Sequence, residues 1–280
     1  MISNHNTLPK VSCCLCTYDR LKLAQKSIEC FLNQTYPNKE LIIVSEGPKA
    51  FKDNLSLFLY ELNNPPNIKV IFLDGQFTLG AIRNISIKNA SGDLYCQWDD
   101  DDFNHPKRLA TQIGFMLKER AQASFLKDQL HYYWESKELY WEKWNYKNCP
   151  DRCSWIPGTI IMRIDPRFSY PETGNVAKAG EDVVLVDQLW HKYVHEDYRI
   201  ACLEDKGYMH VYSYHGAVCN HKNTFNQDHH MYLSKNKSFL TEDMQEKEHL
   251  ISDALDQNNL DDEIKVMGRN GLAFRYLRNR

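Results

Sequence analysis

The first 120 residues alternate between short apolar runs and segments whose apolar side chains recur every three or four positions. The apolar runs are residues 11–17, 41–44, 70–73 and 94–98. The segments with helical spacing are residues 24–32, 55–62, 81–90 and 109–117. Nearly continuous apolar runs are typical of strands covered on both faces. Their alternation with helices of this length predicts an α/β fold, with a parallel sheet and helices on both sides.

The second half of the chain is more mixed. Aromatic residues at 131–134 and 139–141 flank a polar turn, which predicts a hairpin. Further strands are expected at residues 158–162, 199–203 and 209–214, and a helix at 183–193. No Gly/Ser-rich linker separates the halves, so we expect one domain over residues 1–235, divided into 1–120 and 121–235. The polar residues 236–280 are expected to form a helical C-terminal tail.

Composition and charge narrow the choice of partners. The net charge of −3 and pI near 6.4 provide no basic surface for nucleic acid. No run approaches the roughly 18 apolar residues of a membrane span, and residues 1–6 lack the apolar core of a signal peptide. We therefore expect a cytoplasmic protein. Residues 271–278 mix apolar and basic side chains, which fits either peripheral contact with the inner face of the plasma membrane or an ordinary packed C-terminal helix.

Four consecutive aspartates, Asp99, Asp100, Asp101 and Asp102, follow the apolar run at 94–98. Like charges this close destabilise one another, and a divalent cation removes that cost. The run ends a predicted strand and precedes a predicted helix with Pro106 near its first turn, which is where α/β sheets bind ligands. The pattern predicts a cation that in turn binds a diphosphate.

Several motifs together resemble family 2 glycosyltransferases of the GT-A fold. They are residues 9–12 (PKVS), 17–20 (TYDR), 31–37 (FLNQTYP), 40–44 (ELIIV), 80–84 (GAIRN), 90–95 (ASGDLY) and 106–109 (PKRL). The resemblance is close over residues 9–117 and looser to about 230. It implies a GT-A type nucleotide-binding sheet and an inverting transferase that uses a nucleotide-activated sugar with Mn²⁺ or Mg²⁺.

The same resemblance implies roles for the aspartates. The family's metal motif, Asp-x-Asp-Asp, maps onto this run and makes Asp101 the direct metal ligand. Asp99 and Asp100 then position the ribose or the water around the metal, with Asp99 as a further candidate ligand. Asp102 either supports a metal ligand or caps the following helix.

The resemblance also implies a nucleotide-binding group. Tyr18 matches an aromatic position beside the nucleobase, and Thr17 and Asp19 lie in the same loop. Glu46 stands where the family usually has an aspartate that contacts the base edge. Arg83 is expected to pair with the nucleotide or with the aspartates.

An acidic pair and two histidines complete the candidate site. Glu181 and Asp182 resemble the family's pair near the acceptor, with Asp182 as the general base and Glu181 as its alternative. Some relatives carry a His-Gly-x-Asn-Thr-aromatic motif whose histidine binds the metal. Here His215-Gly216 is followed by extra residues before Asn223, so either His215 or His221 matches, with His215 preferred because it directly follows a predicted strand.

These observations predict an inverting glycosyltransferase that moves a sugar, expected to come from a UDP-sugar, to a hydroxyl of a glycan or lipid-linked glycan. The relatives imply a role in surface polysaccharide or lipopolysaccharide synthesis. The alternative is a metal-dependent nucleotidyltransferase acting on a sugar phosphate. Such an enzyme normally has a Gly-rich basic loop after its first strand, and residues 17–20 contain no glycine.

Overall fold

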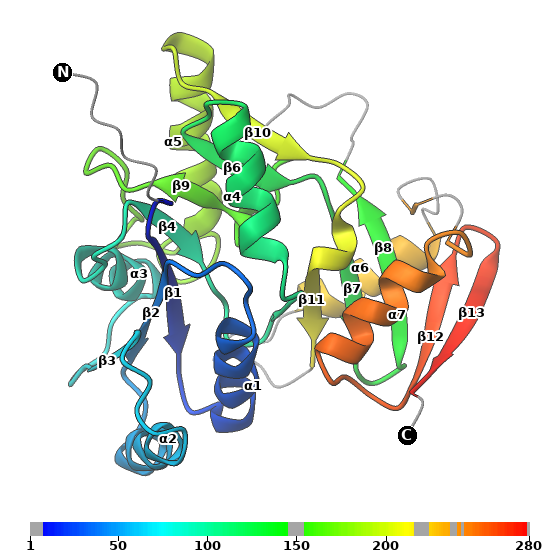
Figure 1. The fold of residues 1–280 in the computed structure, drawn as a ribbon, viewed down its shortest axis with the longest axis horizontal. Coiled ribbons are helices and arrows are strands. Elements are labelled where there is room, and N and C mark those ends of the chain that lie inside the picture. The colour runs from blue at the N-terminus through cyan, green and yellow to red at the C-terminus, as the bar shows by residue number, and fades with distance from the viewer. Residues whose placement is uncertain (1–7, 145–153, 216–223, 236–239, 242–243, 279–280) are drawn as a thin grey trace.

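Two β-sheets lie side by side in the computed structural model, which describes residues 8–144, 154–215, 224–235, 240–241 and 244–278 (Figure 1). The first sheet has seven strands in the order β10-β6-β9-β4-β1-β2-β3. The second has six in the order β13-β12-β8-β7-β11-β5. The expected α/β class is confirmed.

The elements have the following bounds. The strands of the first sheet are β1 (Val11–Thr17), β2 (Lys39–Ser45), β3 (Ile68–Phe72), β4 (Leu94–Gln97), β6 (Ala123–Leu126), β9 (Ile161–Arg163) and β10 (Ile200–Leu203). Those of the second are β5 (Phe103–Asn104), β7 (Asp128–Tyr133), β8 (Glu138–Lys143), β11 (His210–Tyr214), β12 (Glu263–Gly268) and β13 (Gly271–Leu277). The α-helices are α1 (Leu21–Leu32), α2 (Lys49–Glu61), α3 (Leu79–Lys88), α4 (Arg108–Lys118), α5 (Glu181–His195), α6 (Thr224–Lys235) and α7 (Glu248–Gln257).

The first sheet is mixed rather than wholly parallel. β1 pairs in parallel with β2 and β4, as the alternating pattern predicts. β9, however, runs antiparallel to both β4 and β6. It is inserted between them after the chain has passed through the β7–β8 hairpin of the second sheet, so no crossover helix sets its direction. β6 has only four residues, too few for a periodic pattern, and was not predicted.

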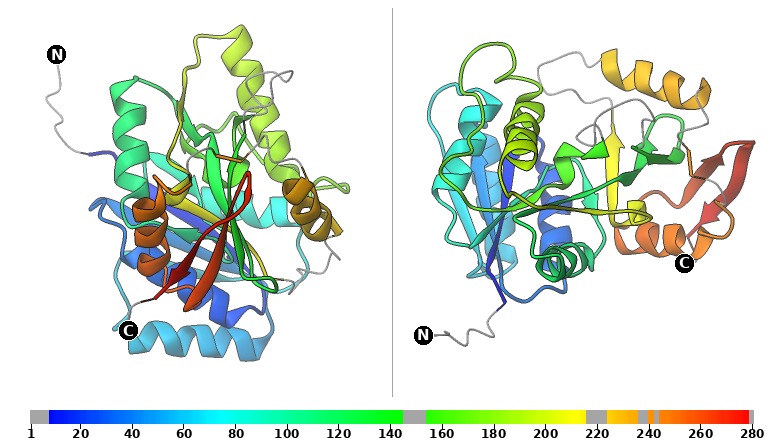
Figure 2. Two further views of the ribbon diagram at one scale, coloured as in Figure 1. Left: turned by 90° about the vertical axis from the view of Figure 1, so that its right-hand side faces the viewer. Right: turned by 90° about the horizontal axis from the view of Figure 1, so that it is seen from above.

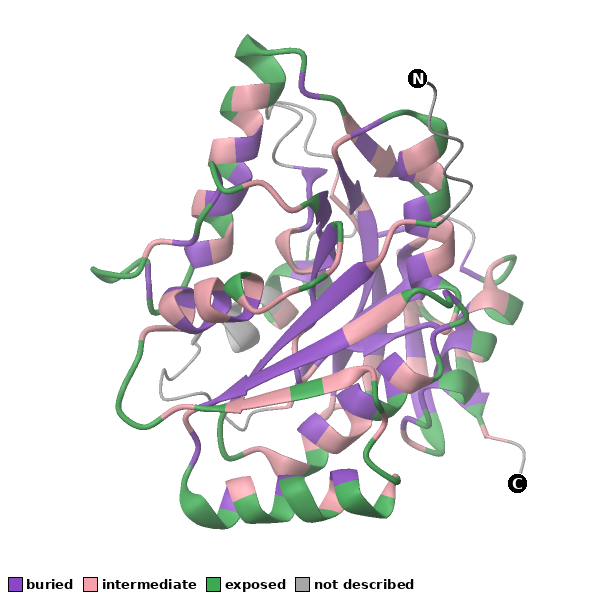
Figure 3. Ribbon diagram, turned by 60° about the vertical axis from the view of Figure 1, so that its left-hand side comes forward, coloured by how far each residue is buried: buried purple, intermediate pink, exposed green. Residues whose placement is uncertain are grey.

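Alternating side chains of β1 supply two hydrophobic cores. Val11, Cys13 and Leu15 pack on one face with residues of α1, α2 and α4, whereas Cys14 and Cys16 pack on the other with residues of α3 and α5. The two faces of the sheet are visible from above in Figure 2, and Figure 3 shows how completely its central strands are buried. Because every residue of β1 is buried, the strand reads as a continuous apolar run.

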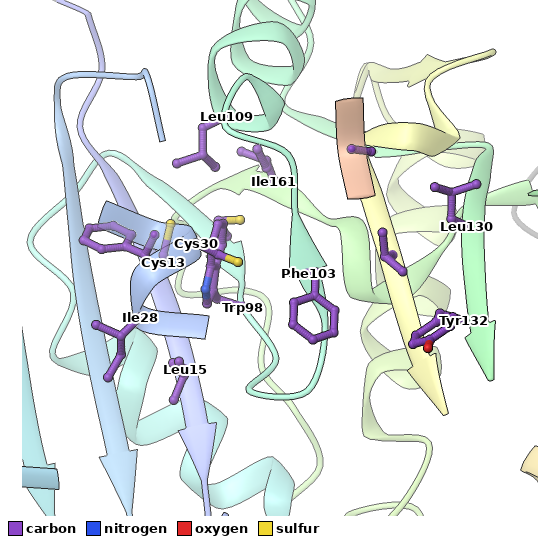
Figure 4. Close-up of a cluster of buried hydrophobic side chains, with 14 of the residues drawn as sticks. Cys13, Leu15, Ile28, Cys30, Trp98, Phe103, Leu109, Leu130, Tyr132 and Ile161 are labelled. Carbon is purple, nitrogen blue, oxygen red and sulfur yellow. The ribbon is translucent and has the colours of Figure 1, made fainter. Parts of the chain in front are cut away.

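The larger core also joins the two sheets. Figure 4 shows Trp98, Phe103 and Leu109 between the first sheet and the second, where Leu130 and Tyr132 of β7 extend the same cluster. Trp98 is fully buried and directly precedes the aspartate run, so packing fixes the point at which that run begins.

The prediction of a helical C-terminal tail is wrong for its last part. α7 is helical, but β12 and β13 form an antiparallel hairpin, and β12 pairs in parallel with β8. Successive side chains of a strand point to opposite faces, and Ile264 and Val266 of β12 both pack into the larger core. Tyr276 of β13 packs into the same core. The alternation of buried and more exposed positions is therefore that of strands. The tail is therefore part of the second sheet, and the expected boundary at residue 235 does not separate it from the hairpin at 131–141.

The sequence predicted that a helix follows the aspartate run directly, and the structure differs. β5 follows it and pairs antiparallel with β11, and α4 begins only at Arg108. β5 therefore carries the chain from the first sheet to the second immediately after the aspartates. This crossing places residues of both sheets around the acidic run.

Candidate functional site

The candidate residues of the first sheet meet at the carboxyl edge of its parallel strands. Thr17 ends β1, Glu46 directly follows β2, and the aspartate run begins two residues after β4. Open α/β sheets bind ligands at this edge because the strands end together there and the loops diverge. Thr17 is connected directly to the run, since its Oγ1 donates a hydrogen bond of 2.7 Å to Asp100 Oδ2.

Arg20 lies beside two of the aspartates. Its Nη1 is 2.8 Å from Asp101 Oδ2, and its Nε donates to Asp100 Oδ2 at 3.1 Å. Burial and the Asp101 carboxylate raise the pKa of Asp100 to about 7, although Arg20 and Thr17 oppose the shift. Burial would also raise the pKa of Asp101, but the hydrogen bond with His215 and the charge of Arg20 hold it below its usual value.

β11 of the second sheet brings His215 to the acidic run, beside the predicted metal ligand Asp101. Its Nε2 lies 3.2 Å from Asp101 Oδ2, and its ring contacts Trp134 with 6.3 Å between centroids. The residue directly follows β11, which fixes its approach. The alternative candidate, His221, lies outside the described residues.

Asp102 points into the protein interior rather than capping a helix. Its Oδ1 accepts a hydrogen bond of 3.2 Å from the Ser213 backbone N–H, and its Oδ2 lies 3.3 Å from His210 Nε2. Burial and the neighbouring aspartates raise the pKa of Asp102 well above its usual value, and burial lowers that of His210. The helix-cap alternative is wrong, since Lys107 occupies the N-cap position of α4. Asp102 instead ties the acidic run to β11.

A buried arginine connects the aspartate run to the acidic pair. Arg83 on α3 is 5% exposed, with Nη2 2.9 Å from Asp99 Oδ1 and Nε 2.8 Å from Glu181 Oε1. Burial opposes the charged form, but the two carboxylates raise the pKa of Arg83 well above its usual value. Gln97 donates to the other oxygen of Asp99 at 2.8 Å. Of the two alternatives for Arg83, pairing with the aspartates is the one seen here.

Asp182 differs from its neighbour Glu181. Glu181 is 2% exposed and bonded to Arg83, whereas Asp182 is half-buried and its Oδ1 accepts only a local bond of 2.8 Å from the Val183 N–H. Burial and the adjacent Glu181 raise the pKa of Asp182 to about 6. Such a pKa keeps a carboxylate ionised at neutral pH while making it a stronger base than an ordinary aspartate.

The residues expected around a nucleobase differ in their exposure to solvent. Tyr18 is 48% exposed and Asp19 is also exposed, with φ of +46° at Asp19 where the chain turns from β1 into α1. Glu46 is half-buried, and its Oε2 accepts a hydrogen bond of 2.7 Å from the Phe77 N–H. Tyr18 and Asp19 therefore face solvent beside the acidic run, while Glu46 also holds the loop that leads into α3.

The charge balance of the site favours a cation. Arg20 pairs with Asp100 and Asp101, and Arg83 pairs with Asp99 and Glu181, so each of these guanidinium groups faces two acidic side chains. Among the described residues, no three His, Cys, Asp or Glu side chains converge as a ready-made metal site. Asp101 and His215 do converge, and Mn²⁺ or Mg²⁺ bound with phosphate substrates needs only one or two protein ligands. The residues fit a cation whose remaining ligands are diphosphate and water oxygens.

The sequence singled out most of this cluster but not Arg20. The residue lies in the TYDR motif, yet a guanidinium one residue before a helix usually faces solvent. Here it is turned toward Asp100 and Asp101 by the first turn of α1. Its position three residues after Thr17, in a loop at a strand's carboxyl end, was the available signal.

Comparison with known proteins gives three consistent findings. The model of the Glycosyl transferase family 2 matches residues 12–170. EpsE of Bacillus subtilis, named as a glycosyltransferase, is 31% identical over 115 residues, which are 41% of this chain and 41% of that protein. WcaA of Escherichia coli, named for colanic acid biosynthesis, is 32% identical over 108 residues, covering 38% of this chain and 37% of its own. The chain thus matches about two fifths of the length of these relatives.

Solved structures share the fold at low sequence identity. Residues 1–349 of TarS from S. aureus, in complex with UDP, superpose with a TM-score of 0.58 and 18% identity, covering 88% of this chain and 70% of that one. The mannosyltransferase PcManGT from Pyrobaculum calidifontis, in complex with GDP-Man and Mn²⁺, gives a TM-score of 0.56 at 11% identity, covering 89% of this chain and 70% of that one. These identities support the GT-A-like architecture alone.

Proposed function

Since the chain belongs to glycosyltransferase family 2, we propose that it is an inverting glycosyltransferase that moves a sugar from a nucleotide-diphosphate donor to a glycan hydroxyl. The observation that carries the proposal is the pairing of two differently tuned acidic groups. One is the aspartate run with His215, where a cation and diphosphate fit, and the other is Asp182, whose raised pKa suits proton removal. Arg83 holds the two groups in fixed relation.

The diphosphate would lie against Asp101 and His215. A bound Mn²⁺ or Mg²⁺ would supply charge neutralisation for the departing diphosphate. Asp101 has the more exposed carboxylate, 26% against 1% for the side chain of Asp100, and its lowered pKa keeps it ionised. Both oxygens of Asp99 already accept hydrogen bonds, so we assign Asp99 to holding Arg83, with metal binding by Asp99 staying a prediction.

The acceptor proton would go to Asp182. The Glu181 carboxylate is buried and bonded to Arg83, which leaves it poorly placed to take a proton from an incoming hydroxyl. Asp182 is adjacent and more accessible. In an inverting reaction, the acceptor oxygen attacks the anomeric carbon from the side opposite the diphosphate, so a base and a metal site on either side of the transferred sugar are what the chemistry needs.

The donor is proposed to be a UDP-sugar. A uridine and its ribose would lie at the carboxyl edge of β1 and β2. The candidate residues for binding them there are Thr17, Tyr18, Asp19, Glu46 and Asp100. Two solved structures of TarS contain UDP and UDP-GlcNAc, and that of PcManGT contains GDP-Man, so a GDP-sugar is the alternative that a donor screen must include.

The acceptor is proposed to be a glycan or lipid-linked glycan of a surface polysaccharide. WcaA, named for colanic acid biosynthesis, supports this class. The described part of the chain contains no helix of the length and apolarity needed to cross a bilayer. Peripheral contact with the cytoplasmic membrane face is proposed through β13, an edge strand on which Leu272 and Leu277 are 48% and 62% exposed beside the basic Arg275.

A donor screen tests the proposal. Purified protein with Mn²⁺ is incubated with UDP-glucose, UDP-galactose, UDP-N-acetylglucosamine and GDP-mannose, and nucleotide release is measured with and without glycan acceptors. We expect hydrolysis of one UDP-sugar well above the others, abolished by EDTA. Lys127→Ala serves as a control, since Lys127 pairs with Glu204, away from the acidic run. Release from none of the four donors would contradict the proposed donor class, and exclusive release from GDP-mannose would replace UDP by GDP.

A further inference from the structure

Tyr212 is a half-buried residue in the middle of an otherwise buried strand. It belongs to β11, whose remaining residues are all buried. The strand is parallel to β7, and Tyr212 is opposite His131. Its ring packs on the rings of His131 and Tyr214, with centroid distances of 5.8 and 4.8 Å. The phenol ring is therefore held by its neighbours while part of the side chain remains accessible.

The strand brings Tyr212 next to the acidic run. The backbone N–H of the following residue, Ser213, donates to Asp102 Oδ1 at 3.2 Å, and His215 on the same strand end contacts Asp101. Burial raises the pKa of Tyr212 well above its usual value, and the carboxylates of the aspartate run and of Asp182 add to this. Tyr212 also shares a face of β11 with His210, whose Nε2 lies 3.3 Å from Asp102 Oδ2, so the phenol borders the aspartate run.

The Tyr212 hydroxyl has capacity for a ligand. Within the described residues it makes no hydrogen bond, whereas the hydroxyl of Tyr214, two residues along on the same face, bonds His131 Nδ1 at 3.2 Å. A protonated phenol can both donate and accept a hydrogen bond. A polar group that is packed in place and lacks a protein partner at a site edge is suited to a polar substrate.

We propose that the Tyr212 hydroxyl binds a ring hydroxyl of the sugar that is being transferred. In an in-line displacement the base, the acceptor oxygen, the anomeric carbon and the diphosphate follow one another. A neutral phenol that borders the aspartate run from the second sheet is suited to the next group in this order, which is the donor sugar. This inference rests on the proposed function, and it makes Tyr212 a determinant of donor specificity.

The test compares the sugar donor with its nucleotide. Affinities of UDP and of the UDP-sugar selected by the donor screen are measured by calorimetry with Mn²⁺ for the wild type, Tyr212→Phe and Tyr214→Phe. Tyr212→Phe loses one neutral hydrogen bond to the sugar. It should therefore bind the UDP-sugar about 2- to 10-fold more weakly than the wild type and bind UDP with unchanged affinity. Tyr214→Phe is the matched control, because it removes a hydroxyl from the same face without changing the ratio of the two affinities.

Deoxy donors sharpen the test and separate it from the proposed function. A donor that lacks the contacted hydroxyl should bind the wild type and Tyr212→Phe equally well. An unchanged UDP-sugar to UDP affinity ratio in Tyr212→Phe overturns the inference, as does equal weakening of both ligands, which would place the phenol on the diphosphate. A wild type that binds no nucleotide sugar would instead contradict the proposed function and the inference together.

Discussion

Buried charges occupy different positions in the two sheets. In the first, Arg83, Asp99 and Glu181 meet at the carboxyl edge of the strands, where loops diverge. In the second, His131 of β7 meets Glu142, the next-to-last residue of β8, with His131 Nε2 2.8 Å from Glu142 Oε2 and side chains 2% and 0% exposed. The His131 ring also stacks on Tyr214 at 5.7 Å. One group borders a site that a ligand can reach, whereas the other is a fully buried pair.

The chemistry of the two pairs differs as well. A guanidinium does not lose its proton in a protein, so Arg83 is a permanent charge that needs both of its carboxylates. An imidazole can be neutral and still donate a hydrogen bond, so the His131–Glu142 contact can persist with one fewer charge. The first network therefore has fixed charge suited to holding a charged substrate, and the second is a hydrogen-bonded part of the core.

The largest expected effect is at the proposed metal ligand. Asp101→Asn should lower turnover by more than about 10³-fold, because the contribution of a metal to charge neutralisation is several kcal/mol. It should also abolish the tightening of UDP binding by Mn²⁺, measured by calorimetry. Thermal unfolding should remain cooperative at a similar temperature, since Arg20 keeps Asp100 as a partner.

EDTA-treated wild type is the control for this prediction and should resemble Asp101→Asn. Equal affinity of the wild type for UDP with and without Mn²⁺ would contradict the metal assignment. His215→Ala should lower turnover less than Asp101→Asn does. The decrease should be larger with Mn²⁺ than with Mg²⁺, because nitrogen ligands favour the transition metal.

The next effect is at the proposed base. Asp182→Asn should lower turnover by about 10²- to 10⁴-fold, with little change in UDP affinity. Because a general base works deprotonated and the pKa of Asp182 is raised to about 6, the pH profile of wild-type kcat/KM should contain a limb that falls as pH drops through 6, besides any limb from Asp100 near 7. The variant should lack this dependence. Turnover of Asp182→Asn equal to that of the wild type would transfer the role to Glu181.

These sites differ in how far the sequence alone can define them. Asp99 to Asp102 are contiguous and follow a buried strand, so their common location follows from the pattern. The contacts of Arg20 and Tyr212 depend on the rotation of a helix and on the pairing of β11 with β7 and β5, which no local pattern specifies. Pairings between distant strands are set by packing of the whole domain.

The C-terminal hairpin is a different case, because a signal was present. Ile264 and Val266 alternate with polar residues, and Asn270-Gly271 is a strong hairpin turn signal, with φ of +103° at Gly271. The overall polarity of residues 236–262 outweighed this pattern. β12 is then stabilised by pairing with β8, where Lys265 is opposite Glu138, 127 residues earlier in the chain.

The third prediction concerns a variant that removes Arg83 from its contacts with Asp99 and Glu181. Arg83→Met keeps the bulk of the side chain but leaves Asp99 and Glu181 without their cation, so it should lower the free energy of unfolding by about 3–5 kcal/mol. Denaturant unfolding measures the loss. Arg167→Met, which removes an exposed arginine paired with Asp165 and Glu196, should change the midpoint little. Comparable midpoints for the two variants would show that the buried network contributes no more than a surface pair.

The smallest effect is expected from the same kind of change in the second sheet. Glu142→Gln keeps the shape and an oxygen that can accept hydrogen bonds from His131 and from Trp144 Nε1, and a neutral imidazole still donates one. The free energy of unfolding should therefore fall by only about 1 kcal/mol, the net value of an altered hydrogen bond. Turnover should fall far less than in Asp182→Asn, because Glu142 acts on the proposed site through His131, whose ring packs on Tyr212. A loss as large as that of Arg83→Met would mean that His131 carries a fixed positive charge, and the distinction between the two sheets would then be one of location alone.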